Sequence, residues 1–233
     1  FEPRFLYWAD QLGYLCWGEH ANWLLDVSTP AALLYFLPEW LEAVERDYSH
    51  PSIVGWCPFN ETQRGQDDRV IDAVYVATKR LDPTRPVIDT SGYIHVRTDI
   101  YDCHDYEQDP VKFAEHYKAL AEGGIPFINH NEKHTYDPNI PFFVSEFGGA
   151  RWAPGKEGWG YGNDPKTVEE FIQRFRALVT TLLNNPRICA FCYTQLTDVE
   201  QEVNGLYTYD RKPKFDPAVL SAILSQKAAI EKE

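Results

Sequence analysis

The amino-acid sequence predicts an α/β fold of the TIM, or (β/α)8, barrel type. Two observations support this prediction. Short apolar runs of strand character alternate with amphipathic helical segments, and several of these runs end in polar or acidic residues. Such alternation is typical of a parallel sheet with helices packed outside it, and the carboxyl ends of barrel strands carry catalytic groups. With 233 residues, 44% of them hydrophobic, the chain can build one large domain with a substantial core.

The first part of the chain follows this alternation. A helical stripe of apolar residues opens the sequence and ends at Gly13, and residues 14–19 follow as a strand. Thr29 is expected to cap the next helix, with Pro30 at its first position. This helix is predicted to break or restart at Pro38, because proline cannot donate a backbone hydrogen bond.

The rest of the chain repeats the same units. Four more helices are expected, each opening at an aspartate: at Asp67, and at the Asp-Pro pairs that begin at Asp109, Asp164 and Asp216. The remaining strands are predicted at 52–59, 86–90, 99–104, 142–147 and 188–193.

Six predicted strands are two short of a closed barrel of eight. Because the chain begins within a helix, we expect the first two β/α units to lie upstream. Residues 1–233 would then be a catalytic barrel domain that is incomplete on its N-terminal side and supplies approximately the third to the eighth strands.

The composition narrows the classes of partner. A net charge of −13 argues against a nucleic-acid or anionic-membrane partner, because both require a basic face. Five cysteines in a chain of this length argue against a disulfide scaffold. Cys189 and Cys192 have a CxxC spacing within one strand, which points them to opposite faces, and we expect both to be small core residues.

Two glutamates stand where a predicted strand meets a loop. Glu61 follows Asn60 after the strand at 52–59, and Glu146 closes the apolar run that begins at Pro141. Most enzymes that cleave glycosidic bonds use two carboxyl groups that lie on either side of the bond, and in a barrel these would meet at the carboxyl ends of the strands. The alternative is a pair of surface glutamates at strand ends.

Five segments of the chain resemble glycoside hydrolase family 2, which contains β-galactosidases, β-glucuronidases and β-mannosidases. The segment from His50 to Trp56, leading to Asn60-Glu61, is similar to the acid/base signature of this family. The segment 143–149 is similar to its nucleophile segment. Further similarity lies in residues 4–10, 193–200 and 204–208.

The resemblance implies a retaining mechanism. Glu61 would protonate the leaving oxygen, so it must hold a proton near neutral pH, while Glu146 would be ionised and attack the anomeric carbon. Retention requires the two carboxyl groups to lie about 5–5.5 Å apart. Asn60 would donate a hydrogen bond to the sugar 2-hydroxyl.

Further residues are expected to bind substrate. The family places a donor beside the nucleophile, which favours Tyr106, with His104 lining the pocket or serving as a structural histidine. Long aromatic loops at this face bind ligands, which indicates the segment 148–163. The whole expected set is Asn60, His104, Tyr106, Trp17, Glu19, Trp152, Tyr193, Gln195 and Asn204, with pairing to a buried arginine as the alternative for Glu19.

These observations favour an exo-acting retaining β-glycosidase that hydrolyses terminal β-linked sugars, above all β-galactosides. The alternatives are a β-glucuronidase or another β-glycosidase of the same mechanism, and a barrel that binds sugars without cleaving them. No metal or other cofactor is expected. The expected partners are a glycoside or oligosaccharide substrate and upstream β-sandwich domains of a longer parent chain, and a homo-oligomer is compatible with the sequence.

Overall fold

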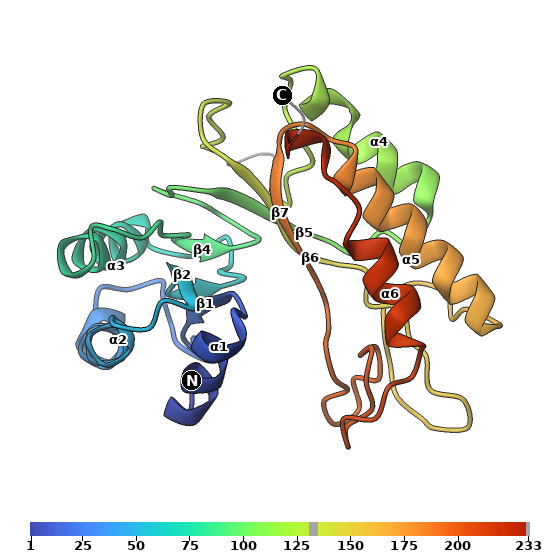
Figure 1. Ribbon diagram of the computed structural model, residues 1–233. Helices are drawn as coiled ribbons and strands as arrows, with labels where there is room; N and C mark the ends of the chain where they lie inside the picture. Colours follow the sequence, from blue (N-terminus) through green and yellow to red (C-terminus); the bar gives the residue numbers. More distant parts are fainter. Residues whose placement is uncertain (131–134, 232–233) are drawn as a thin grey trace. The chain divides into compact units, whose positions relative to one another are not determined.

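The computed structural model describes residues 1–130 and 135–231 (Figure 1). The chain divides into two compact units. The first comprises Phe1–Asp102 and Ile128–Ile140, and the second comprises Cys103–Phe127 and Pro141–Glu233.

The first unit contains helices and short parallel strands in alternation. Strand β1 pairs with β2, and β3 pairs with β4, both in parallel. The elements are α1 (Pro3–Leu12), β1 (Cys16–Glu19), α2 (Ala32–Asp47), β2 (Ile53–Cys57), β3 (Phe59–Asn60), α3 (Asp68–Leu81) and β4 (Thr90–Ser91).

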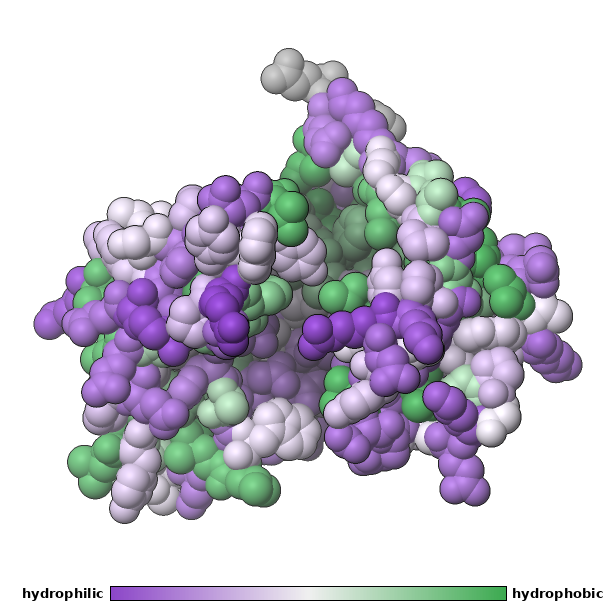
Figure 2. All heavy atoms as spheres, turned by 60° about the horizontal axis from the view of Figure 1, so that its bottom comes forward, coloured by the Kyte–Doolittle hydropathy of each residue, from purple (hydrophilic) through white to green (hydrophobic). Residues whose placement is uncertain are grey.

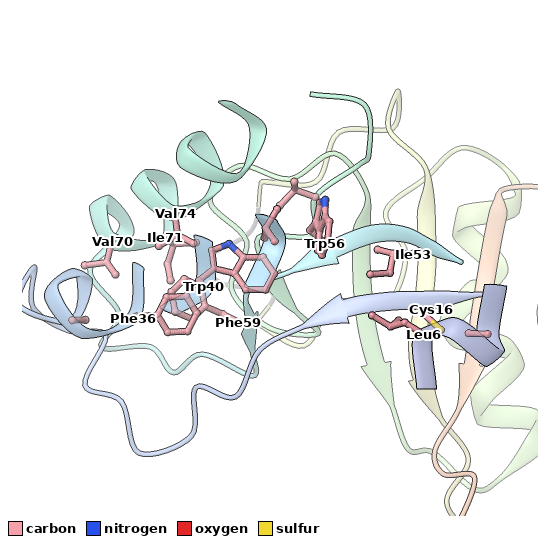
Figure 3. Close-up of a cluster of buried hydrophobic side chains, with 14 residues drawn as sticks. Leu6, Cys16, Phe36, Trp40, Ile53, Trp56, Phe59, Val70, Ile71 and Val74 are labelled. Atoms are coloured by element: carbon pink, nitrogen blue, oxygen red, sulfur yellow. The ribbon is translucent and has the colours of Figure 1, made fainter. Parts of the chain in front are cut away.

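The core of the first unit is an apolar cluster between α2, α3 and the strands (Figure 3). Phe36 of α2 stacks on Phe59 with ring centroids 4.4 Å apart, and Trp40 meets Trp56 edge to face at 6.0 Å. Both buried indoles keep a hydrogen-bond partner, since Trp40 Nε1 donates to Thr78 and Trp56 Nε1 donates to Asp82, each over 2.8 Å. Burial therefore leaves neither indole nitrogen unpaired.

Two predictions about the second helix are wrong. Thr29 does not cap α2, whose N-cap position is Ala31 and has no side-chain cap. Pro38 lies inside α2, which continues unbroken to Asp47. The buried side chains of Phe36 and Trp40 lie on either side of this proline, and their packing compensates for the one missing backbone hydrogen bond.

The predicted strand at 52–59 is divided in the structure. It becomes β2 and β3, with Pro58 between them. The predicted strand at 86–90 is reduced to a single parallel bridge between Val87 and Trp56, followed by β4. The helix predicted from Asp67 is confirmed, and the Asp67 side chain accepts a hydrogen bond from the backbone N–H of Arg69.

The second unit is a three-stranded sheet with helices and long loops. The sheet has the order β5-β6-β7, and β6 and β7 are parallel. The elements are β5 (Tyr101–Asp105, which begins in the first unit), α4 (Pro110–Ala121), β6 (Phe142–Phe147), α5 (Val168–Leu183), β7 (Ile188–Tyr193), α6 (Pro217–Leu224) and a 3-10 turn (Ala229–Glu231).

Most predicted boundaries in the second unit are confirmed. Strands β6 and β7 have the predicted limits, and Asp109 and Asp216 cap α4 and α6 as expected. The helix predicted to open at Asp164 begins instead at Val168, because the Thr167 hydroxyl accepts the N–H of Glu170. Asp164 pairs with Arg151.

The prediction that Cys189 and Cys192 are core residues is wrong, since both are exposed. Among the described residues, β7 pairs on one side only, with β6, so part of this strand stays open to solvent. Cys16, Cys57 and Cys103 are buried.

Exposed apolar side chains interrupt a mostly hydrophilic surface on the face drawn in Figure 2. In α1, Leu6 and Ala9 are buried, whereas Phe5, Trp8 and Leu12 are exposed, so the predicted apolar stripe covers more than the buried face. Within residues 1–130 and 135–231, the strands form separate sheets of two, two and three strands, and no closed ring of strands is present. No helix in this part of the chain has the length and apolar character that crossing a bilayer requires.

Candidate active site

Glu61 lies directly after β3, where strand pairing ends. Asn60 pairs with Ser91 of β4, and the backbone N–H of Glu61 donates to the carbonyl of Ser91 over 3.0 Å. Glu61 has a φ of +51°, in a region that non-glycine residues seldom occupy. Backbone conformations of this kind concentrate at functional sites, where neighbouring contacts hold them in place.

Asn22 brackets the backbone of Asn60. Its side-chain oxygen accepts the Asn60 N–H over 2.8 Å, and its side-chain nitrogen donates to the Asn60 carbonyl over 3.0 Å. Asn22 is 8% exposed, so these bonds satisfy a buried amide. The loop after β1 is thereby fixed to the Asn60-Glu61 segment.

A pocket of about 410 Å³ lies beside this segment, entirely within the first unit. The loop after β1 forms one wall and residues 60–66 form the other, and Glu61 is among the lining residues. Trp23 and Leu24 contribute apolar surface, whereas Asn60, Gln63 and Gln66 contribute polar groups. Such a mixture of apolar surface and a few polar groups is typical of small-ligand sites.

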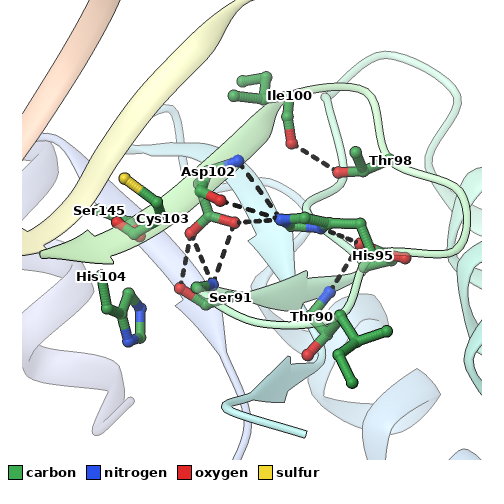
Figure 4. Close-up of polar contacts among 12 residues, drawn as sticks. Thr90, Ser91, His95, Thr98, Ile100, Asp102, Cys103, His104 and Ser145 are labelled. Carbon is green, nitrogen blue, oxygen red and sulfur yellow. Dashed lines mark hydrogen bonds and ion pairs between the residues drawn. The ribbon is translucent and has the colours of Figure 1, made fainter. Parts of the chain in front are cut away.

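A buried ionic network supports β4 (Figure 4). His95 Nδ1 lies 2.6 Å from Asp89, and Nε2 lies 3.0 Å from Asp102, with all three side chains fully buried. Asp102 also accepts the Ser91 hydroxyl over 2.9 Å. Burial alone lowers the pKa of His95, but the two carboxylates outweigh it and raise the pKa to about 10. The imidazole is therefore charged near neutral pH.

Glu146 lies near the end of β6 in the second unit. Tyr106 donates its phenolic O–H to Oε2 of Glu146, and His104 Nε2 lies 3.5 Å from Oε1. Burial, and then the charge of Glu146, hold the pKa of Tyr106 well above its ordinary value of 10.0. Tyr106 therefore stays protonated and remains a donor to the carboxylate.

The loop after β6 reinforces this arrangement. Tyr161 stacks on Tyr106 with ring centroids 3.5 Å apart and an interplanar angle of 7°. The N–H of Tyr161 donates to the Gly149 carbonyl over 2.8 Å, which returns the loop to the end of β6. Trp159 meets Tyr161 edge to face at 5.7 Å. The aromatic loop thus supports the residue that orients Glu146.

The side chains of Gln195, Asn204 and Glu202 are linked by hydrogen bonds after β7. Gln195 Nε2 donates to Asn204 Oδ1 over 2.8 Å, and Asn204 Nδ2 donates to Glu202 over 3.1 Å. Asn204 is fully buried, and a Cβ placed on Gly149 would come within 3.2 Å of its amide nitrogen. These side chains therefore lie close to the loop that begins just after Glu146.

The other expected binding residues lie elsewhere. The ring of Trp17 covers Gly55 of β2, and Glu19 lines a different pocket, of about 510 Å³, beside His20. Trp152 faces Phe215 with centroids 6.1 Å apart.

Tyr193 packs on Phe147 at 5.6 Å and on Phe175 of α5 at 5.2 Å.

Several supporting residues were missed by sequence reasoning. No short sequence motif marks Asn22, Asp89, His95 or Asp102. The only signal in the sequence is the position of the two aspartates near predicted strand ends.

Lys214 was also missed. Its Nζ lies 2.5 Å from Asp198 and donates to the Val203 carbonyl over 3.1 Å, which fixes the loop that carries Asn204.

Short parallel strands that alternate with helices, with glutamates at the strand ends, are features of a (β/α) barrel domain with a site at that edge. Residues 17–225 match the family described as "Glycosyl hydrolases family 2, TIM barrel domain", and the chain belongs to this family. The predicted fold is confirmed as a fragment of such a barrel, and the predicted family is confirmed.

The proteins that match this chain in sequence include several β-galactosidases. The β-galactosidase of Thermoanaerobacterium thermosulfurigenes is 24% identical over 245 residues, which covers 95% of this chain and 30% of that protein. The β-galactosidase BgaC of Bifidobacterium adolescentis is 30% identical over 118 residues, which covers 47% of this chain and 10% of that protein. The chain thus spans less than a third of the length of either relative.

Solved structures show the same fold. A β-galacturonidase from Eisenbergiella tayi, bound to galacturonate, superposes with a TM-score of 0.68 at 19% identity, covering 96% of this chain and 43% of that chain. The β-D-glucuronidase of Dictyoglomus thermophilum superposes with a TM-score of 0.68 at 22% identity. The match covers 97% of this chain and 43% of that chain. At these identities the likeness concerns the fold alone.

Proposed function

We propose that this barrel domain hydrolyses terminal β-linked galactosides as a retaining exo-glycosidase. One observation carries the proposal. Glu146, near the end of β6, is held by the Tyr106 hydroxyl on one carboxylate oxygen and faces His104 with the other. A carboxylate that accepts a hydrogen bond at one oxygen and faces an imidazole with the other is oriented for attack on a bound sugar.

In the proposed first step, ionised Glu146 attacks the anomeric carbon while Glu61 gives its proton to the departing glycosidic oxygen. The bond to the leaving group breaks, and a covalent glycosyl-enzyme forms on Glu146. Asn60 donates to the sugar 2-hydroxyl, a contact that strengthens in the transition state.

In the proposed second step, Glu61 acts as a base and takes a proton from a water molecule that attacks the anomeric carbon. The bond to Glu146 breaks and the sugar leaves with its original configuration. The Tyr106 hydroxyl keeps its hydrogen bond to Glu146 in both steps. It stabilises the negative charge that returns to the carboxylate when the glycosyl bond breaks.

The relatives support galactose as the sugar. The matching proteins from Thermoanaerobacterium thermosulfurigenes and Bifidobacterium adolescentis are β-galactosidases. The names β-glucuronidase and β-galacturonidase belong to structures that share the fold. We further infer that the domain acts within a longer chain, because the matching β-galactosidases are more than three times as long. The family resemblance implies that this longer chain carries β-sandwich domains upstream.

The test is a panel of 4-nitrophenyl β-galactoside, β-glucuronide, β-mannoside and β-glucoside with the full-length parent protein. We expect hydrolysis of the galactoside, and its loss in Glu146→Gln, which keeps the shape but removes the nucleophile. Glu45→Gln, which changes an exposed glutamate on α2, is the matched control and should keep full activity.

Hydrolysis of the glucuronide instead would select that alternative sugar. A folded protein that binds galactose without cleaving any glycoside would contradict the enzymatic proposal.

A further inference from the structure

We infer that Gln108 is a positioning residue for the proposed nucleophile, and that it acts by holding Tyr106 against Glu146. The inference rests on the proposed function, because it concerns the donor that orients Glu146. Gln108 lies three residues after the end of β5, and its side chain is buried. One nitrogen of this side chain connects the two strand ends beside which Tyr106 and Glu146 lie.

The Gln108 amide joins the ends of β5 and β6. Its Nε2 donates to the carbonyl of Tyr106 over 3.1 Å and to the carbonyl of Gly148 over 2.6 Å. Tyr106 is the first residue after β5, and Gly148 is the first residue after β6. A side-chain amide nitrogen carries two hydrogens, so it can donate to both carbonyls at once. The two strand ends are therefore held at a fixed separation just beyond the sheet.

This separation decides whether Tyr106 reaches Glu146. The Tyr106 hydroxyl donates to Oε2 of Glu146, and a hydrogen bond weakens steeply when its donor is displaced or turned. A shift of the Tyr106 backbone would carry the ring and its hydroxyl with it. The hydrogen bond from Gln108 to the Tyr106 carbonyl therefore also holds the hydroxyl on the carboxylate. The rate is sensitive to this position, because a misplacement of about 1 Å can cost about a hundredfold.

Gln108 also supports the loop that covers Tyr106. Gly162 lies in this loop with a φ of +66°, and a Cβ at this position would collide with Cγ of Gln108. The backbone of the loop therefore packs directly on the Gln108 side chain. Tyr161, the preceding residue, stacks on the ring of Tyr106. One side chain thus holds Tyr106 by its carbonyl and supports the ring that lies against it.

The end of β5 is also anchored by Asp105, independently of Gln108. Oδ2 of Asp105 accepts the Tyr117 hydroxyl over 3.0 Å and lies 2.8 Å from Nδ1 of His116, and both partners belong to α4. These contacts hold β5 to α4 without the Gln108 side chain. We therefore expect a substitution of Gln108 to leave the fold in place while releasing the link between the ends of β5 and β6.

The experiment is a double-mutant cycle in the full-length parent protein. Gln108→Met keeps the length of the side chain and removes the donor, and we expect it to lower kcat/KM for 4-nitrophenyl β-galactoside by about tenfold. The loss should appear in kcat, with KM within about twofold of wild type, because Gln108 acts on the nucleophile rather than on the bound sugar. In Tyr106→Phe the hydroxyl is absent, so adding Gln108→Met should lower kcat/KM by less than about a further twofold.

Gln173→Met is the matched control, because Gln173 is exposed on α5, and it should leave kcat and KM unchanged. Gln108→Glu is a second variant that keeps the shape of the side chain. Its carboxylate would face two carbonyl oxygens without a donor, so it should lower kcat/KM at least as much as Gln108→Met. Urea denaturation reports whether each variant is folded.

Three outcomes would overturn the inference and leave the proposed function intact. The first is full activity in both Gln108 variants. The second is a loss that multiplies with that of Tyr106→Phe, which would mean that Gln108 does not act through the Tyr106 hydroxyl. The third is failure of both Gln108 variants to fold, which would assign the side chain to the fold alone. If the wild type hydrolyses no glycoside, the proposed function itself fails, and the inference fails with it.

Discussion

Tyr106 donates its hydroxyl hydrogen to the carboxylate of Glu146, and the ring of Tyr161 lies flat against Tyr106. The hydrogen bond therefore connects Tyr106, which directly follows β5, to Glu146 on the neighbouring strand β6. The contact matters chemically because an O–H donor beside a carboxylate stabilises the charged form and fixes its orientation.

Tyr106→Phe should keep the ring and lose this donor. A hydrogen bond to a charged group contributes about 1.5–3 kcal/mol, so we expect kcat/KM for 4-nitrophenyl β-galactoside to fall by roughly ten- to a hundredfold. Steady-state kinetics of the full-length protein measures this. Tyr161→Phe keeps the stacked ring and should stay within about threefold of wild type. Equal activity of Tyr106→Phe and wild type would show that the hydroxyl does not act on Glu146.

Glu61→Ala should separate substrates by leaving group. A glycoside with a poor leaving group, such as methyl β-galactoside, needs acid assistance and should lose about 10²–10⁴-fold in rate. A nitrophenyl galactoside needs little assistance in the first step, and added azide should restore turnover and give β-galactosyl azide. Product analysis by NMR distinguishes the azide adduct. Equal losses on both substrates, without rescue by azide, would contradict the acid/base assignment.

Asn22→Ala should lower both stability and activity. The substitution leaves the Asn60 N–H and carbonyl without the side chain that brackets them, which costs about 1–3 kcal/mol when such groups are buried. Urea denaturation measures the loss in the free energy of unfolding. A lower kcat for 4-nitrophenyl β-galactoside would report that Glu61 is no longer held in its position. Asn184→Ala, at an exposed position at the end of α5, is the control and should change neither quantity.

His95 should make stability fall as the pH rises. Its pKa is raised from 6.5 to about 10 in the folded protein, so its charged form stabilises the fold fully below about pH 6.5. This contribution is lost progressively as the pH rises through 10, with a slope of up to about 1.4 kcal/mol per pH unit. Denaturation at several pH values between 6.5 and 10 gives the slope. In His95→Gln, which cannot be charged, the slope should be smaller. An unchanged slope would mean that His95 does not carry the linkage.

The sequence by itself determined the elements whose signals are local. Asp109 and Asp216 precede prolines and cap helices, and the apolar runs at 142–147 and 188–193 form strands with those limits. Each signal depends on backbone chemistry within a few residues, so it can be read without the fold. The placement of Glu61 and Glu146 at strand ends follows from the same local patterns.

The tertiary structure decided what depends on residues distant in the sequence. Pro38 stays within α2 because Phe36 and Trp40 are buried against the strands, and this packing outweighs a local preference. Cys189 and Cys192 are exposed because burial depends on which neighbours cover a strand.

The supports of the two glutamates also required the fold. Asn22 lies 38 residues from Asn60, and Tyr106 lies 40 residues from Glu146. Contacts over such separations form only when the chain packs, because the two residues of each pair lie on different strands or on the loops that follow them.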